Sequence, residues 1–186
     1  RVPDLADIDT TCALLTFLGK KVVRDRNRVT IKSGGRIHTQ APYELVRKMR
    51  ASVLVLGPLI ARLGKASASL PGGCAIGVRP VNIHLKGFEQ LGAKTSLSEG
   101  FVKLITKGLK GNKVTLAFPS VGATENLLMA ASLAQGRTVI ENAAREPEIV
   151  DLADCLIGMG ADIHGAGTSR IFVNGKKVLS GVSHNV

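Results

Sequence analysis

The segment that decides the fold is His84–Ile105, HLKGFEQLGAKTSLSEGFVKLI, because its pattern occurs three times in the chain. Each copy is an amphipathic stretch that ends in an apolar residue and glycine, followed by residues of alternating polarity. The other two copies are Asp9–Ile31 and Asp151–Val173. Equivalent glycines lie 73 and 68 residues apart, at Gly19, Gly92 and Gly160. We expect each glycine to end a helix in the left-handed conformation and a β-hairpin to follow it. The expected hairpin turns are Arg26-Asn27, Glu99-Gly100 and Thr168-Ser169.

A second unit alternates with the first. It is a strongly apolar stretch followed by a strand, and it occurs as Tyr43–Leu63 with Ala66–Leu70 and as Val121–Ala134 with Thr138–Glu141. A helix that is apolar on nearly all sides must be buried, and Pro58 should kink the first of these helices.

The two units together repeat at a period of roughly 70 residues. Two full repeats fit the chain, preceded by half a repeat that lacks its buried helix. The sequence therefore predicts a single α/β (α+β) domain of repeated sheet-and-helix units around buried helices, an inside-out α/β arrangement.

Composition limits the classes of function. The chain has 186 residues, 45% of them hydrophobic, which is typical of a globular domain with a real core. Its net charge of +11 suits an anionic partner (nucleic acid, acidic lipid or a phosphorylated small molecule) or a solubilising surface. Aromatic residues make up 3%, which argues against a module that stacks single-stranded nucleic acid.

Cysteine usage and hydropathy point to one compartment. The three cysteines are far apart and odd in number, so they do not suggest a disulfide framework. The longest unbroken apolar run, Val53–Ala61, is too short to cross a bilayer. We expect a cytoplasmic protein.

The segment Leu70–Pro80, LPGGCAIGVRP, interrupts the periodic pattern with glycine and proline and reads as a long loop. It carries one thiol, Cys74, and one guanidinium, Arg79. Cys74 is either an inert buried thiol or a reactive one, made accessible by the loop and activated by the neighbouring cation.

A candidate anion site begins at Ser120. Free backbone N–H groups at the start of the helix after Ser120 could hold a phosphate, although an ordinary N-cap explains the same residues. Arg50, at the inner end of the first apolar helix, is costly there unless it is paired or points into a polar site. Arg145–Glu148 reads as a helix start with proline in its first turn. No histidine has metal-ligand spacing, so we expect no metal.

Four segments together resemble a known family: Ala41–Ala51, Leu70–Val81, Phe118–Thr124 and Glu141–Glu148. They are similar to the UDP-N-acetylglucosamine 1-carboxyvinyltransferases, the enolpyruvyl transferases that open bacterial peptidoglycan synthesis, and the resemblance runs along essentially the whole chain. Members have two domains of the inside-out α/β kind with the active site between them. The resemblance implies that residues 1–186 are most of the catalytic-loop domain, without its first helix and without the second domain.

The resemblance also implies a reaction and a set of site residues. Enolpyruvyl would pass from phosphoenolpyruvate to the 3-hydroxyl of UDP-N-acetylglucosamine with release of phosphate, and no metal or organic cofactor would be needed. Cys74 would be the proton donor and the thiol alkylated by the inhibitor fosfomycin. Asn82 and Phe118 stand where many members have Asp and some have Lys, respectively. The substrate-binding residues implied are Arg50, Arg79, Pro80, Val81, Asn82, Ile83, Phe118, Pro119, Ser120, Val121 and Gly122.

Two other functions remain open on the sequence. One is a non-catalytic module that binds a sugar nucleotide or acts as a scaffold. The other is RNA binding, because the RNA 3'-phosphate cyclases resemble this fold and the chain is basic, although the scarcity of aromatic residues argues against it. We expect the isolated chain to be inactive. We also expect it to self-associate through apolar surface of the helices Val53–Ile60 or Leu127–Leu133 that the absent helix leaves open.

Overall fold

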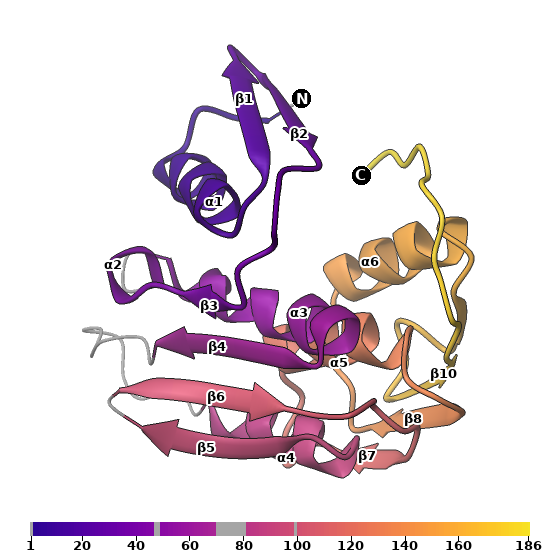
Figure 1. The fold of residues 1–186 in the computed structure, drawn as a ribbon. Helices are drawn as coiled ribbons and strands as arrows, with labels where there is room; N and C mark the ends of the chain where they lie inside the picture. Colours follow the sequence, from indigo (N-terminus) through magenta and orange to yellow (C-terminus); the bar gives the residue numbers. More distant parts are fainter. Residues whose placement is uncertain (1, 47–48, 70–80, 99) are drawn as a thin grey trace.

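A computed structural model describes residues 2–46, 49–69, 81–98 and 100–186, and three helix-and-hairpin units follow one another along the chain (Figure 1). Each unit is an α-helix followed by two antiparallel strands. They are α1 (Ala6–Phe17) with β1 (Lys21–Asp25) and β2 (Arg28–Lys32), α4 (Asn82–Gln90) with β5 (Lys94–Ser98) and β6 (Phe101–Ile105), and α6 (Pro147–Gly158) with β9 (Asp162–His164) and β10 (Arg170–Asn174).

The glycines after these helices have the predicted conformation. Gly19, Gly92 and Gly160 have φ of +95°, +88° and +99°, in the left-handed region that glycine enters at no steric cost. The turn at Arg26-Asn27 is confirmed, because Asp25 pairs with Arg28. The turn at Thr168-Ser169 was placed too narrowly: Phe172 pairs with His164, and the longer connection 165–169 contains two further glycines with positive φ.

Two crossover units connect the hairpin units. The first is β3 (Gln40–Ala41), α2 (Tyr43–Val46), the 3₁₀-helix η1 (Arg50–Val55), α3 (Leu56–Leu63) and β4 (Lys65–Ser69). The second is β7 (Lys113–Thr115), α5 (Val121–Ala131) and β8 (Arg137–Glu141). In each unit the two strands are parallel, β3 with β4 and β7 with β8.

The first apolar stretch is not the single kinked helix that was expected over Tyr43–Leu63. Its described parts form α2, η1 and α3. Pro58 lies in the first turn of α3, where the N–H that proline lacks would have no helical partner. Ser132 is the C-cap of α5, so that helix ends before the expected Ala134.

The crossover strands complete two of the sheets. Their strand orders are β3-β4-β6-β5 and β7-β8-β10-β9, in which β4 pairs with β6 and β8 with β10. The hairpin β1-β2 forms a two-stranded sheet among the described residues. The predicted α/β units around buried helices are confirmed, as three open sheets rather than a closed barrel.

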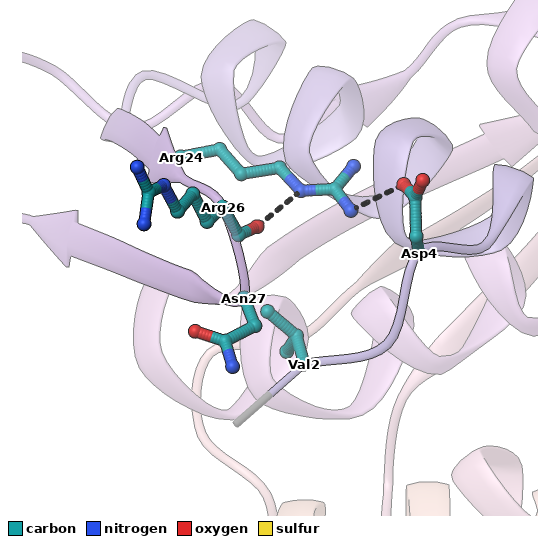
Figure 2. A pocket seen from close by; sticks show the side chains of 5 residues that line it. All are labelled: Val2, Asp4, Arg24, Arg26 and Asn27. Carbon is teal, nitrogen blue, oxygen red and sulfur yellow. Dashed lines mark hydrogen bonds and ion pairs between the residues drawn. The ribbon is translucent and has the colours of Figure 1, made fainter.

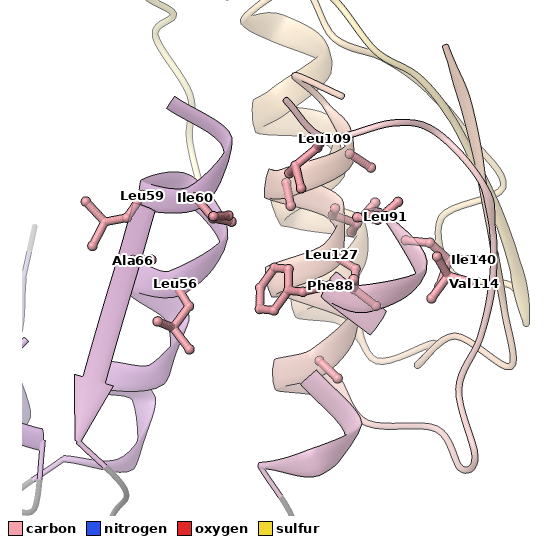
Figure 3. Close-up of a cluster of buried hydrophobic side chains, with 14 of the residues drawn as sticks. Leu56, Leu59, Ile60, Ala66, Phe88, Leu91, Leu109, Val114, Leu127 and Ile140 are labelled. Carbon is pink, nitrogen blue, oxygen red and sulfur yellow. The ribbon is translucent and has the colours of Figure 1, made fainter. Parts of the chain in front are cut away.

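The core lies between the two four-stranded sheets. Buried side chains run from Ala66 of β4 through α3, α5 and α4 to Ile140 of β8 (Figure 3). Helices α3 and α5 approach very closely, because a Cβ added to Gly57 would lie 2.5 Å from the backbone oxygen of Asn126. Glycine at this position therefore brings the backbones of two helices together.

The two apolar helices do not carry the exposed surface that was expected of them. Leu56, Ile60, Leu127 and Leu128 are fully buried, because α3 and α5 cover each other and the two larger sheets cover both. Exposed apolar side chains occur in the hairpin units instead, for example Ile31 of the first unit at 51% and Leu97 of the second at 58% exposure. No helix in the described part of the chain is both long and apolar enough to cross a membrane.

Candidate functional site

The starts of α4 and α5 meet η1 at one place, and the buried amide of Asn126 joins them. Its Oδ1 accepts a hydrogen bond from the backbone N–H of Gly57 at 2.8 Å. Its Nδ2 lies 3.1 Å from the backbone oxygen of Val53 and 3.0 Å from Nδ1 of His84. One side chain on α5 therefore fixes the positions of η1, α3 and α4.

His84, in the first turn of α4, is the titratable group of this cluster. The residue is 8% exposed, and burial lowers the pKa of its imidazole to about 4. The ring is therefore neutral near pH 7, where one nitrogen donates a hydrogen bond and the other accepts one. Its burial is that of a side chain packed in the core.

The start of α5 lies against the imidazole of His84. A Cβ added to Gly122 would lie 3.4 Å from Cε1 and 3.9 Å from Nε2 of the ring, and 3.9 Å from Cδ2 of Leu54. Because His84 directly follows Ile83, this contact brings the predicted segment 81–83 beside Gly122. Two of the segments implied for one ligand thus lie together, although they are distant in sequence.

The first turn of α5 offers backbone donors. Ser120 is its N-cap, and Oγ of Ser120 accepts a long hydrogen bond of 3.4 Å from the N–H of Ala123, as the N-cap interpretation predicted. The first helical hydrogen bond runs from Thr124 N–H to the Ser120 carbonyl at 2.9 Å. The N–H groups of Val121 and Gly122 precede it and point out of the helix end, where the dipole also favours negative charge.

The start of α6 adjoins the other side of α5. Oγ1 of Thr124 accepts a hydrogen bond of 3.1 Å from the N–H of Ala144, just before α6. An open hollow of about 420 Å³ lies beside it, lined by Pro119, Ala143, Arg145 and Glu146. The helix start expected at Arg145–Glu148 is confirmed, because Pro147 opens α6.

A pair of carboxylates marks the contact between α5 and α6. Burial, and secondarily the charge of Glu148, raise the pKa of Glu125. Glu125 therefore keeps its proton to a higher pH than an exposed glutamate would, where α5 packs on α6.

The predicted site residues divide into four groups. Val81, Asn82, Ile83, Ser120, Val121 and Gly122 lie together at the starts of α4 and α5. Phe118 is 45% exposed and precedes Pro119, which lines the hollow. Arg50 is placed by its backbone at the start of η1, whereas Cys74, Arg79 and Pro80 lie outside the described residues. Sequence reasoning missed Asn126, whose only signal is its place as the last polar residue before the apolar run Leu127–Ala131.

A second hollow, of about 540 Å³, lies in the first hairpin unit and is lined by Val2, Asp4, Arg24, Arg26 and Asn27 (Figure 2). The guanidinium of Arg24 forms ion pairs with Asp4, at 2.9 Å, and with Asp9. Its charge is thus already compensated, and the hollow contains none of the predicted site residues. Among the described residues, no three His, Cys, Asp or Glu side chains form a metal-binding group.

Comparison with known proteins agrees with this architecture. The chain is 58% identical over 186 residues to the UDP-N-acetylglucosamine 1-carboxyvinyltransferase of Shewanella amazonensis, and 57% identical over 185 residues to UDP-N-acetylglucosamine 1-carboxyvinyltransferase 2 of Carboxydothermus hydrogenoformans. All of the chain is covered in both cases, but it spans 44% of the length of these curated relatives. These identities confirm the resemblance that the sequence motifs indicated.

Solved structures share the fold at low sequence identity. The enolpyruvyl transferase NikO from Streptomyces tendae superposes with a TM-score of 0.79 over 94% of this chain and 41% of its own, at 21% identity. EPSP synthase from Acinetobacter baumannii gives 0.70 over 92% of this chain and 40% of its own, also at 21% identity. The model of the EPSP synthase family matches residues 1–186 in full. The chain therefore belongs to the EPSP synthase (3-phosphoshikimate 1-carboxyvinyltransferase) family.

Proposed function

We propose that residues 1–186 are most of the catalytic-loop domain of a UDP-N-acetylglucosamine 1-carboxyvinyltransferase, within a longer two-domain enzyme of peptidoglycan synthesis. The 58% identity to a relative with that name supports this substrate over other enolpyruvyl acceptors. The chain length, 44% of that relative, supports a division into two domains. A protein with this role would work in the cytoplasm, where both substrates are made.

The observation that carries the proposal is the meeting of residues 81–83 with residues 120–122. Backbone N–H groups of Val121 and Gly122, at the positive end of α5, are suited to the diphosphate of a sugar nucleotide. Val81 and Ile83 flank the same place, and Ile83 is 7% exposed. The polar side chain of Asn82 is exposed beside them. Anion donors beside apolar and polar side chains suit UDP-N-acetylglucosamine better than a simple anion.

The proposed reaction is an addition followed by an elimination. The 3-hydroxyl oxygen of the sugar forms a bond to C2 of phosphoenolpyruvate, while the Cys74 thiol gives a proton to C3. The hydroxyl proton passes to a base, which we expect the second domain to supply. Phosphate then leaves C2 while a proton passes from C3 back to the Cys74 thiolate, which restores both the double bond and the thiol. Arg50 and Arg79 would neutralise the phosphate and carboxylate charges.

The isolated chain is expected to bind the sugar nucleotide weakly and not to turn over. Half of a cleft leaves the substrate open to water and removes the preorganisation that domain closure provides. The non-catalytic alternative, a sugar-nucleotide-binding module, predicts the same weak binding. The two proposals differ at Cys74, which only the transferase requires as a reactive thiol.

The test is the intact mass of the chain after incubation with fosfomycin, with and without UDP-N-acetylglucosamine. We expect one adduct, on Cys74, that forms faster with the nucleotide present. The half-buried thiols of Cys12 and Cys155 serve as internal controls and should stay unmodified. A Cys74→Ser variant should form no adduct. No adduct on Cys74 in either condition would contradict the transferase assignment, and a phosphate-release assay would detect any turnover.

We also propose that the isolated chain self-associates through the first hairpin unit. Val23 and Ile31 are exposed by 61% and 51%, and the outer edge of β2 has no partner strand among the described residues. An unpaired edge beside apolar side chains invites pairing with a second copy. The Ile31→Lys variant should shift sedimentation toward the monomer, and a concentration-independent monomer for the unmodified chain would rule the proposal out.

A further inference from the structure

The hydrogen bonds of Asn126 determine which nitrogen of His84 carries the proton. The Gly57 N–H donates to one end of the Asn126 amide, and the Val53 carbonyl can only accept from the other. Both partners are backbone groups with fixed roles, so the amide cannot be turned around without losing both hydrogen bonds. Nδ2 of Asn126 is therefore the donor that lies 3.0 Å from Nδ1 of His84.

This donor fixes the tautomer of the neutral imidazole. Nδ1 must accept from Asn126, so in the neutral ring the proton is on Nε2. The low pKa of His84, about 4, keeps the ring neutral near pH 7. The structure thus specifies the Nε2–H tautomer without any contact to a ligand.

The Nε2–H group lies beside the open end of α5. Nε2 has no hydrogen-bond partner among the described residues, although His84 as a whole is only 8% exposed. The Cε1–Nε2 edge faces Gly122, whose missing side chain leaves the ring 3.4 Å from where a Cβ would be. The Nε2–H group therefore adds one more donor to the free N–H groups at the start of α5, where an anion can accept from both.

We propose that Asn126 is a positioning residue, which holds His84 in the Nε2–H tautomer so that the imidazole joins the α5 backbone in donating hydrogen bonds to a phosphate oxygen of a nucleoside diphosphate. This inference rests on the proposed function for the identity of the nucleotide, but not for the tautomer. His84 acts here as a neutral donor, and Asn126 does not touch the ligand.

Two observations distinguish this role from simple packing. A packing role needs only the bonds that tie α5 to η1 and α3, which Asn126 makes to Gly57 and Val53. The third bond, to His84, adds an orientation that packing does not require. Moreover, glycine at 122 exposes the ring edge, whereas an alanine methyl there would meet the ring at ordinary contact distance and cover it.

The first experiment reads the tautomer directly. Nitrogen-15 NMR of the imidazole, with the His84 signals identified by their loss in His84→Gln, should show the Nε2–H form in the unmodified chain. Asn126→Asp keeps an acceptor for Gly57 but removes the donor to His84, so Nδ1 should become protonated. An Nδ1–H tautomer in the unmodified chain would overturn the inference.

The second experiment links the tautomer to binding through a matched pair of variants. The amide nitrogen of glutamine can occupy the place of Nε2, whereas asparagine reaches only the place of Nδ1. His84→Gln should keep the affinity for UDP within about twofold, and His84→Asn should weaken it by about tenfold, the value of one hydrogen bond to a charged group. Gly122→Ala should fold normally and weaken UDP binding as well. Equal losses in the two His84 variants would mean that the ring acts through packing alone.

The choice of nucleotide separates this inference from the proposed function. If UDP shifts the Nε2 signal but UDP-N-acetylglucosamine binds no better than UDP, the sugar assignment fails while the positioning role stands. If neither nucleotide shifts the Nε2 signal of the unmodified chain, the positioning role fails. Fosfomycin labelling of Cys74 tests the proposed function independently of both results.

Discussion

The first and third hairpin units have the same pattern but different surroundings. Strand β2 reads Arg-Val-Thr-Ile-Lys over residues 28–32, and strand β10 reads Arg-Ile-Phe-Val-Asn over residues 170–174. Ile171 and Val173 are fully buried, whereas Ile31, the counterpart of Val173, is 51% exposed. Strand β10 lies between β8 and β9, whereas β2 pairs with β1 alone among the described residues.

This difference shows what a hairpin unit requires. A hairpin with one helix cannot bury its own apolar face, and it becomes core only when a crossover unit supplies a strand for its edge and a helix for its face. The crossover helices also make the candidate site, because α5 contributes the free N–H groups and the Asn126 amide. The first unit has no described crossover and no counterpart of that site.

The largest expected effect is a cavity in the third unit. Ile171→Ala removes a fully buried side chain between β8 and α5, and should lower the free energy of unfolding by about 3 kcal/mol. Urea denaturation monitored by circular dichroism measures it. A loss below about 1 kcal/mol would mean that the third unit is no better packed than the first.

Acid should destabilise the body of the molecule through His84. Its pKa is near 6.5 in the unfolded chain and about 4 in the folded one, so the unfolded state binds a proton first as the pH falls. The stability that the neutral His84 ring contributes is fully present above pH 6.5 and is lost by pH 4. This loss lowers the free energy of unfolding by about 3 kcal/mol. Denaturation at several pH values measures it.

A variant tests the source of this effect. His84→Gln should flatten the acid limb of the stability profile, because glutamine cannot take up a proton in this pH range. An unchanged profile in His84→Gln would show that the imidazole is not desolvated in solution.

A smaller effect is expected at the start of α5. Ser120→Ala removes an N-cap whose hydrogen bond is long, 3.4 Å, so the loss should be about 0.5–1 kcal/mol. The N-cap of α1 is Leu5, whose side chain makes no such bond, so Leu5→Ala should change stability less. Thermal denaturation of the two variants compares the two helix starts. Equal losses of stability in Ser120→Ala and Leu5→Ala would show that the N-cap hydrogen bond of Ser120 does not stabilise α5.

The smallest effect is expected at the exposed counterpart in the first unit. Ile31→Ala should lower the free energy of unfolding by about 0.5 kcal/mol or less, because half of its side chain already faces solvent. The measurement should be made at low protein concentration, where self-association does not contribute. A loss as large as that of Ile171→Ala would mean that β2 is covered in solution.

The sequence predicts the repeated parts of this fold well. Gly19, Gly92 and Gly160 mark helix ends, and the alternating residues after them mark hairpins, because both signals are local. The break between η1 and α3 was missed, since a stretch that is apolar on all sides has no periodicity to indicate where a helix begins. Likewise, local polarity did not reveal the longer turn at 165–169.

The candidate site was predictable in its segments but not in its centre. Residues 81–83 and 120–122 could be named from the family resemblance, and the structure brings them together. The bond between Asn126 and His84 joins residues 42 positions apart, and it depends on how α4 packs against α5. Local pattern contains no information about such a contact.

The central claim is that the starts of α4 and α5 bind the sugar nucleotide while the first hairpin unit does not. Backbone amide NMR of the chain during titration with UDP-N-acetylglucosamine tests it most directly. We predict saturable shifts at residues 81–84 and 120–123, with the amides of residues 21–32 unchanged. Shifts confined to residues 21–32, or spread evenly over the basic surface, would contradict the claim.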